Sequence, residues 1–140
     1  MNKKRTLSII KPDATKKNIT GKIISILEKN NFKIIAQKRL RLSQDKAEEF
    51  YSIHKDKPFF KELTQFMSSN EIVVQILERD DAVKKYREIM GATNPSEAEE
   101  ETIRAKYGDS IQCNAVHGSD SDENASIEID FHFDSNEIFS

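Results

Sequence analysis

The first part of the chain alternates between strand-like and helix-like spacing of apolar residues. Residues 6–10 form a short, mostly apolar run with β-branched residues, which predicts a strand. Apolar side chains then recur at helical spacing over residues 19–27, and two consecutive asparagines end this helix. Over residues 32–42, apolar side chains alternate with polar and basic ones. That alternation predicts a second strand with one buried face.

The middle of the chain predicts two helices and a buried strand. Ser43 is suited to cap a helix whose apolar stripe extends to His54. Pro58 opens a further helical stretch that reaches Met67. Residues 72–77 are almost continuously apolar and rich in β-branched side chains. A short run of this kind is typical of a central strand.

Two more helices are expected before a less regular end. An apolar stripe over residues 83–90 stops at Gly91. Ser96 and Glu99 have the spacing of a capping box for the next helix, and Gly108 ends it.

The last segments are harder to assign from periodicity. Residues 127–133 alternate apolar and polar side chains, which by itself indicates a strand, and the apolar pair 115–116 is too short to assign. The order of elements predicts an α+β fold with a small, mainly antiparallel sheet.

Composition narrows the function classes. The 140 residues match the size of one domain, with 36% hydrophobic and 33% charged residues. A net charge of −2 provides no basic field for nucleic acid, and one cysteine cannot form an internal disulfide. The N-terminal apolar run is too short for a signal peptide, and no run has membrane-spanning length. We therefore expect a cytoplasmic protein with no membrane segment and no specific nucleic-acid partner.

His117 is the most informative residue, because it lies in the loop Asn-Ala-Val-His-Gly-Ser-Asp-Ser at residues 114–121. Gly118 removes the side chain that would crowd the ring, and the polar residues that follow can fix the turn. An imidazole held in this way can act as a nucleophile, a general base or a metal ligand. Taken alone, the loop is also compatible with a surface turn that carries an incidental histidine, and the loop by itself favours that interpretation.

Two metal sites can be tested against the sequence. Residues 120–124 begin like a calcium loop, but the sixth and twelfth positions hold Ala125 and Phe131 rather than glycine and glutamate. No second histidine or cysteine lies at zinc spacing, since Cys113 is the only cysteine. Neither metal site is predicted.

The loop at residues 114–121 resembles the active-site signature of the nucleoside diphosphate kinase family. The likeness covers nearly the whole chain. Similar segments occur in the same order at residues 6–13, 54–60, 91–95 and 102–104. The resemblance implies one domain over residues 1–140 with a ferredoxin-like βαββαβ fold, in which helices cover a four-stranded antiparallel sheet. It also implies a helix over residues 127–133, and we follow it there.

The resemblance implies a ping-pong phosphoryl transfer with broad base specificity. A nucleoside triphosphate such as ATP gives its γ-phosphoryl group to His117, and a nucleoside diphosphate then takes it. Catalytic roles are implied for His117, Lys11, Tyr51, Ser119 and Glu128. Nucleotide-binding roles are implied for Lys11, Phe59, Arg87, Thr93, Arg104 and Asn114. Mg²⁺ is expected on the nucleotide phosphates rather than in a protein cage.

The roles implied for single residues are specific. His117 is the nucleophile through its δ nitrogen, and Glu128 orients the ring either directly or through Ser119. Lys11 and Asn114 hold the sugar hydroxyls, and Lys11 is also one of three cations for the phosphates. The other phosphate ligands are Arg87, Arg104 and Thr93. Tyr51 lies beside the reacting phosphate, and the base stacks on Phe59.

Two other functions fit the same fold class. A binding module could keep the nucleotide pocket without turnover, but the intact His117, Lys11 and Arg104 argue against it. An RNA-binding sheet would need aromatic residues on its central strands, and neither residues 6–10 nor 72–77 contain one. The family resemblance also implies a homo-oligomer built from dimers. We expect a hexamer, with a tetramer as the alternative.

Overall fold

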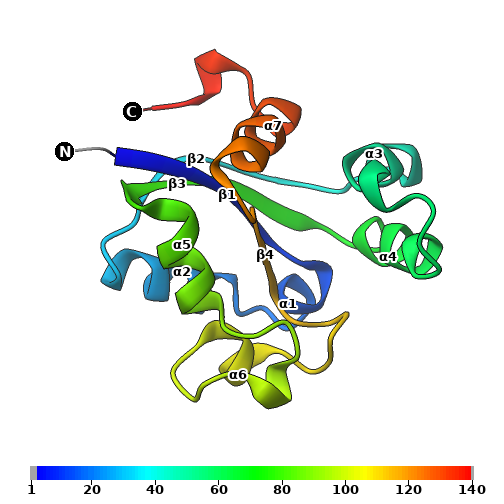
Figure 1. Cartoon of the computed structure of the whole chain (residues 1–140), viewed down its shortest axis with the longest axis horizontal. Coiled ribbons are helices and arrows are strands. Elements are labelled where there is room, and N and C mark those ends of the chain that lie inside the picture. Colours follow the sequence, from blue (N-terminus) through cyan, green and yellow to red (C-terminus); the bar gives the residue numbers. More distant parts are fainter. Residues whose placement is uncertain (1–2, 140) are drawn as a thin grey trace.

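The computed structural model describes residues 3–139, which contain a four-stranded sheet with the strand order β2-β3-β1-β4. Every neighbouring pair of strands is antiparallel, and β1 lies in the centre beside β3 (Figure 1). The strands are β1 (Lys3–Ile10), β2 (Lys33–Leu40), β3 (Ile72–Asp80) and β4 (Val116–Gly118). This order and these directions confirm the ferredoxin-like α+β fold.

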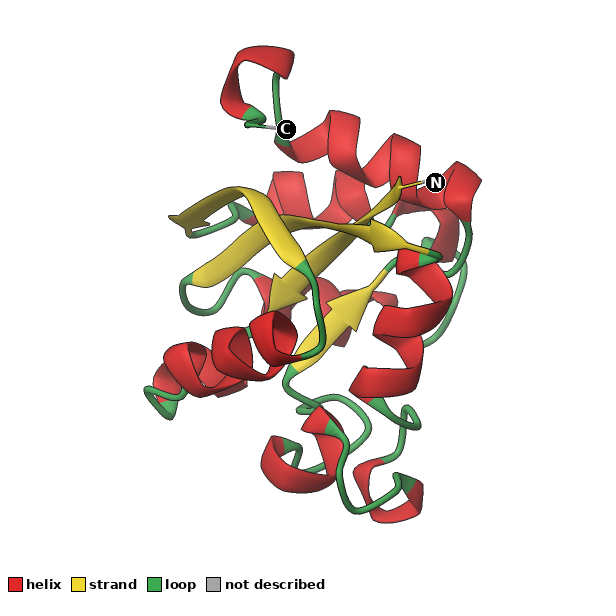
Figure 2. Cartoon of the chain, turned by 90° about the vertical axis from the view of Figure 1, so that its left-hand side faces the viewer, coloured by secondary structure: helices red, strands yellow, loops and turns green. Residues whose placement is uncertain are grey.

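Helices pack on both faces of the sheet (Figure 2). They are α1 (Pro12–Lys16), α2 (Thr20–Lys29), α3 (Gln44–Phe50), α4 (Phe60–Met67), α5 (Ala82–Met90), α6 (Ile103–Tyr107) and α7 (Asp122–His132). Short 3-10 helices occupy Ser52–His54, Pro95–Glu97 and Ser135–Glu137. None of the helices within residues 3–139 has the length and apolar character needed to cross a membrane.

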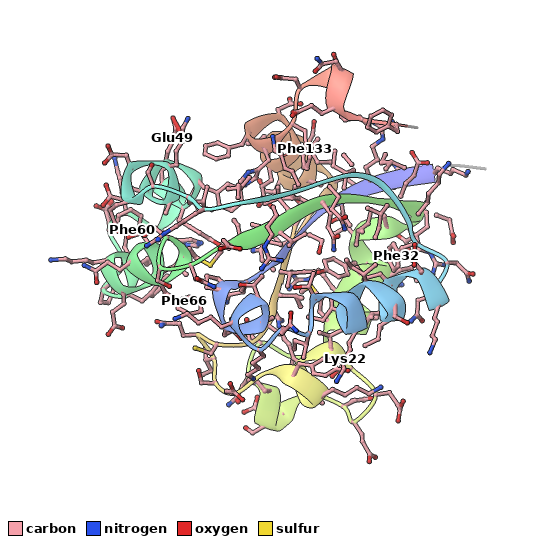
Figure 3. The ribbon with its side chains drawn as sticks, turned by 180° about the vertical axis from the view of Figure 1, so that it is seen from behind. Lys22, Phe32, Glu49, Phe60, Phe66 and Phe133 are labelled. Atoms are coloured by element: carbon pink, nitrogen blue, oxygen red, sulfur yellow. The ribbon has the colours of Figure 1, made fainter. Side chains whose placement is uncertain are left out.

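Alternation along the strands divides the apolar residues into two cores. Ile10 of β1 faces a core formed with α2, α5 and α6, whereas Leu7 faces a core formed with α3, α4 and α7. Phe32 and Phe133 belong to these two cores and lie on opposite sides of the sheet (Figure 3). Because period-two alternation directs successive side chains to opposite faces, one central strand supplies both cores.

The predicted ends of several elements were close to the observed ones. Strand β1 ends before Pro12, which occupies the first turn of α1, a short helix that the pattern did not reveal. The Ser43 hydroxyl accepts a hydrogen bond from the Lys46 amide, which confirms the predicted cap of α3. The regular helix stops at Phe50, and a 3-10 turn carries the chain to His54.

The predicted capping box at Ser96 was wrong. Ser96 lies inside the 3-10 helix Pro95–Glu97, and the Asn94 side chain accepts a hydrogen bond from its amide. Helix α6 begins later, where the Thr102 hydroxyl accepts from the Ala105 amide. The sequence contains several residues able to cap a helix, and the local backbone selects Asn94 and Thr102.

The alternating pattern at residues 127–133 also misled, whereas the family resemblance was right. Helix α7 covers most of this segment and begins at a cap provided by Ser121. Its buried side chains include Ala125, Ile129 and His132, which have helical spacing, while Ile127 is 66% exposed. One exposed apolar residue therefore produced an apparent period of two.

Candidate active site

His117 lies in the middle of β4, the shortest strand, and pairs with Ile9 of β1. The next residue must be glycine, because a Cβ atom on Gly118 would approach the Tyr86 ring to 2.8 Å and the Met90 sulfur to 2.6 Å. Helix α5 thus packs directly against the backbone of β4. The close packing fixes the strand that carries the imidazole.

Only one nitrogen of the His117 ring, Nε2, has a hydrogen-bond partner among the described residues. Its Nε2 atom lies 3.0 Å from Glu128 Oε1, and the Ser119 hydroxyl donates to the same carboxylate oxygen at 2.9 Å. The Leu7 amide in turn donates to the Ser119 hydroxyl oxygen at 3.4 Å. A carboxylate at Nε2 favours the tautomer with the proton there, so Nδ1 keeps its lone pair. No described residue forms a hydrogen bond with Nδ1.

A cavity of about 250 Å³ opens beside this ring. It brings together six of the residues singled out in the sequence: Tyr51, Arg87, Thr93, Arg104, His117 and Glu128. Tyr51 follows α3, and the other five come from α5, the loop after it, α6, β4 and α7. A larger cavity of about 560 Å³ shares Arg87, Thr93 and Arg104 but does not reach His117.

Arg104 presents a fixed positive charge at the edge of the cavity. Its guanidinium donates to the Gly91 carbonyl at 3.0 Å and to the Val116 carbonyl at 2.9 Å. Burial lowers the pKa of Arg104. The Nε atom is buried and has no partner among the described residues. Arg87 is exposed on α5, so its side chain has more freedom than that of Arg104.

Lys11 and Asn114 form a second group, joined to the cavity through Thr93. The Lys11 ammonium donates to the Gln112 carbonyl at 2.8 Å and to Asn114 Oδ1 at 2.9 Å. The Asn114 amide nitrogen donates to the Thr93 carbonyl at 2.9 Å. Burial lowers the pKa of Lys11 to about 8, and the nearby Asp13 carboxylate opposes that shift.

Asp13 supports this group, although it was not among the predicted site residues. Its carboxylate accepts from the Ala115 amide at 3.0 Å, and burial raises its pKa. Ala115 has a φ angle of 74°, in the region that side chains disfavour. Asp13 therefore fixes the bend that leads into β4. The Lys-Pro-Asp turn was the only signal for this role in the sequence.

Two aromatic rings flank His117 on the side of α3. The Phe50 ring lies edge-on to the imidazole, with 5.7 Å between centroids, and the Tyr51 ring lies at 6.3 Å. Burial, and secondarily the Glu128 charge, raises the pKa of Tyr51, so its hydroxyl stays protonated near neutral pH. Phe50 was not predicted as a site residue, because on a helical stripe it is indistinguishable from a core residue.

Phe59 lies apart from the cavity that contains His117. It precedes α4, is 47% exposed, and contacts His54 with 5.6 Å between ring centroids. His54 itself lines the cavity. An exposed ring next to a cavity wall can form one side of a base-binding platform.

Comparison with known proteins decides the family. The family model described as nucleoside diphosphate kinase matches residues 4–138. The chain belongs to the nucleoside diphosphate kinase family. It is therefore a phosphotransferase enzyme that acts on nucleotides.

Relatives and solved structures agree with this assignment. A nucleoside diphosphate kinase of Erythrobacter litoralis is 59% identical over 134 residues, which cover 96% of each chain. One from Campylobacter jejuni is 58% identical, covering 96% of this chain and 98% of its own. The Aquifex aeolicus enzyme structure has a TM-score of 0.96 and 45% identity, covering 98% of this chain and 99% of its own. A Halobacterium salinarum enzyme solved with CDP has a TM-score of 0.95 and 34% identity, covering 99% and 93%.

Proposed function

We propose that this enzyme transfers the γ-phosphoryl group of a nucleoside triphosphate to a nucleoside diphosphate through a phosphohistidine on His117. The observation that carries the proposal is that the imidazole is hydrogen-bonded at Nε2 and not at Nδ1 by the described residues. Glu128 holds Nε2 at 3.0 Å, so the lone pair of Nδ1 is available beside the cavity lined by Arg87 and Arg104. Neutral imidazole is nucleophilic near pH 7 without a separate base.

The transfer has two balanced steps. The Nδ1 lone pair attacks the γ-phosphorus, a P–N bond forms, and the bond from that phosphorus to the bridging oxygen breaks. The first diphosphate leaves with that oxygen, and the phosphorylated imidazolium is stabilised by Glu128. A terminal oxygen of the second diphosphate then attacks the phosphorus, and the electron pair of the P–N bond returns to Nδ1.

The other residues bind and position the nucleotide. Negative charge spreads over the phosphoryl oxygens during transfer, and Arg87, Arg104 and Lys11 supply the compensating positive charge. The Thr93 hydroxyl adds a hydrogen-bond donor, and Tyr51 lines the same cavity as His117. Ser119 shares the Glu128 oxygen that binds the ring and so helps to orient it.

The nucleoside is held at the other end of the site. Lys11 and Asn114, which are hydrogen-bonded to each other, bind the sugar hydroxyls. The base stacks on Phe59. Stacking tolerates every common base, because each has a π-face, and this supports broad base specificity.

Mg²⁺ is proposed to arrive on the nucleotide phosphates, where it neutralises charge. Residues 3–139 contain no group of three or more histidine, cysteine or acidic side chains placed to hold a metal ion. Asp120 lines the cavity and its carboxylate is suited to hold a water ligand of the ion.

We further propose that residues 1–140 act as one domain, in the cytoplasm, as a homo-oligomer.

The covalent intermediate provides the test. Wild-type protein mixed with γ-labelled ATP and Mg²⁺, without acceptor, should gain one acid-labile, base-stable phosphoryl group per chain. Added GDP or CDP should remove it as the corresponding triphosphate. His117→Asn should fold and bind nucleotide but take up no label. Acid-stable label, label on Ser119, or substantial turnover by the variant would each overturn the mechanism.

A further inference from the structure

Phe50 is the last residue of α3, and its ring lies at the centre of an aromatic cluster beside the His117 imidazole, where it also lines the cavity. The ring meets His117 at an interplanar angle of 72° and Tyr51 at 90°, with centroid distances of 5.7 and 4.9 Å. On its other sides are Phe131 at 5.3 Å and His132 at 4.9 Å. Both come from α7, the helix that also carries Glu128.

The hydrogen bond to Glu128 does not by itself fix the plane of the imidazole. It holds one ring atom, Nε2, whereas the terminal torsion of a histidine side chain is broad. An edge-to-face contact restrains the plane as well, because such pairs have a preferred geometry. Phe50 and Glu128 therefore restrain different motions of the same ring.

Phe50 is itself well restrained by its neighbours. His132 is 6% exposed and packs against both Phe50 and Phe131. The Lys46 ammonium lies 5.6 Å from the Phe131 centroid and covers the cluster from α3. The cluster thus joins the end of α3 to α7 at the point where His117 lies.

We propose that Phe50 is a positioning residue that fixes the plane of the His117 ring so that Nδ1 points at the phosphorus. The proposal rests on the proposed function, since it needs His117 as the nucleophile. Small misplacement of a reacting atom is costly: about 1 Å reduces rates on the order of 100-fold. Tyr51 alone does not replace Phe50, because its ring centroid lies farther from the imidazole at 6.3 Å.

Replacing the ring by a flexible apolar side chain tests the proposal. In Phe50→Met and Phe50→Leu, we expect phosphoenzyme formation at saturating ATP and Mg²⁺ to slow by about 10-fold or more. The affinity for nucleotide should stay within about twofold of the value without the Phe50 substitution. It is measured as the nucleotide Kd in the His117→Asn background, where no turnover occurs. A residue that only stabilised the fold would alter the melting temperature without this selective loss of rate.

Phe60 provides the matched control. It is a half-buried phenylalanine packed on the same core, and it lies on α4 (Figure 3). The ring contacts of His117 among the described residues are with Phe50 and Tyr51, not with Phe60. Phe60→Met and Phe60→Leu should lose comparable stability while keeping the wild-type rate. Two variants at each position allow the one that still melts cooperatively to be used.

The outcomes separate this inference from the proposed function. If wild-type protein forms no acid-labile phosphoenzyme, the proposed function fails. If it does, and the Phe50 variants match the Phe60 variants in rate, the positioning role of Phe50 is overturned. A weaker affinity for ATP with an unchanged rate would also overturn it, because Phe50 would then act on nucleotide binding.

Discussion

The charge of Lys11 depends on pH near neutrality, because its ammonium is buried beside Asn114. Burial lowers the pKa of this group to about 8 in the free enzyme. Above that pH, Lys11 loses the proton with which it attracts the nucleotide. We therefore expect kcat/KM to fall as pH rises through about 8, since this ratio reports ionisations of the free enzyme.

Saturating nucleotide provides the control for this prediction. Bound phosphates favour the charged form of Lys11, so kcat should decline at a higher pH than kcat/KM. Steady-state rates between pH 6 and 10 in a constant-ionic-strength buffer measure both. A kcat/KM that stays flat through pH 9, or a simultaneous decline of both, would assign the alkaline limb to another group.

His132 makes stability depend on pH at the acidic end. Burial lowers its pKa from 6.5 to about 4, with Lys38 and His117 adding to the shift and Glu128 opposing it. Below pH 6.5 His132 becomes protonated in the unfolded chain, whereas in the folded chain it stays neutral down to about pH 4. The free energy of unfolding therefore decreases as the pH is lowered through this window, by about 2 kcal/mol between pH 7 and 5.

Removing the titrating ring should remove that contribution. His132→Phe keeps an aromatic side chain in the cluster, so its unfolding free energy should fall about 2 kcal/mol less than the wild type over the same range. Denaturant unfolding at pH 7 and 5 gives the change in unfolding free energy for each protein, and the contributions of the other titrating groups cancel when the two changes are subtracted. An equal change in the two proteins would mean that His132 does not contribute to this pH dependence.

At this scale, only part of the candidate site could be predicted from the sequence. The family motifs pointed to His117, Lys11, Arg104 and Asn114 as candidates. In the structure, His117 and Arg104 line one cavity, and Lys11 donates a hydrogen bond to Asn114. Phe50 could not be found in this way. Its contact with His117 joins segments 67 residues apart, and an apolar residue on a helical stripe gives no signal of such a contact.

At the scale of elements, long segments with strong periodicity were predicted well and short ones were not. Strand β3 and helix α5 follow from their apolar patterns alone. Strand β4 has three residues, too few for any pattern, yet it carries His117, the proposed nucleophile. Its position depends on pairing with β1 and on the close approach of α5 at Gly118, both of which are tertiary.

The segment between α3 and α4 gives a prediction at the same scale. It carries Phe59, which the structure leaves 47% exposed and supported by His54. Phe59→Ala should weaken nucleotide binding by roughly 1–3 kcal/mol, the contribution of one base–aromatic stack. The loss should be similar for purines and pyrimidines, because stacking does not depend on base edges.

Phosphoryl transfer should survive this substitution. At saturating triphosphate, Phe59→Ala should still form the phosphoenzyme, since the ring lies outside the cavity that holds His117. Titration of ADP and CDP into the His117→Asn background, with and without Phe59→Ala, measures the binding loss. A folded Phe59→Ala protein that cannot be phosphorylated at any ATP concentration would show that Phe59 acts on the chemistry instead.

At the scale of the whole molecule, the antiparallel order β2-β3-β1-β4 places His117 on an edge strand and leaves β2 at the opposite edge. The Phe139 amide donates to the Ile35 carbonyl of β2, which occupies one position on that edge. Phe139, at that edge, is a large apolar residue that is 74% exposed. An open strand edge with exposed apolar residues favours association between copies.

The family resemblance implies a homo-oligomer built from dimers, and we expect six chains rather than four. The segment between Gly91 and Ser96 should contribute to contacts between dimers, because it projects from the sheet beside α6 (Figure 1). Light scattering at micromolar concentration should give six chain masses. A mass of four chains would correct only the predicted number of chains, whereas the mass of a single chain would contradict the predicted association. A monomeric variant that still forms the phosphoenzyme would show that the His117 cavity lined by residues of a single chain is sufficient for the first step.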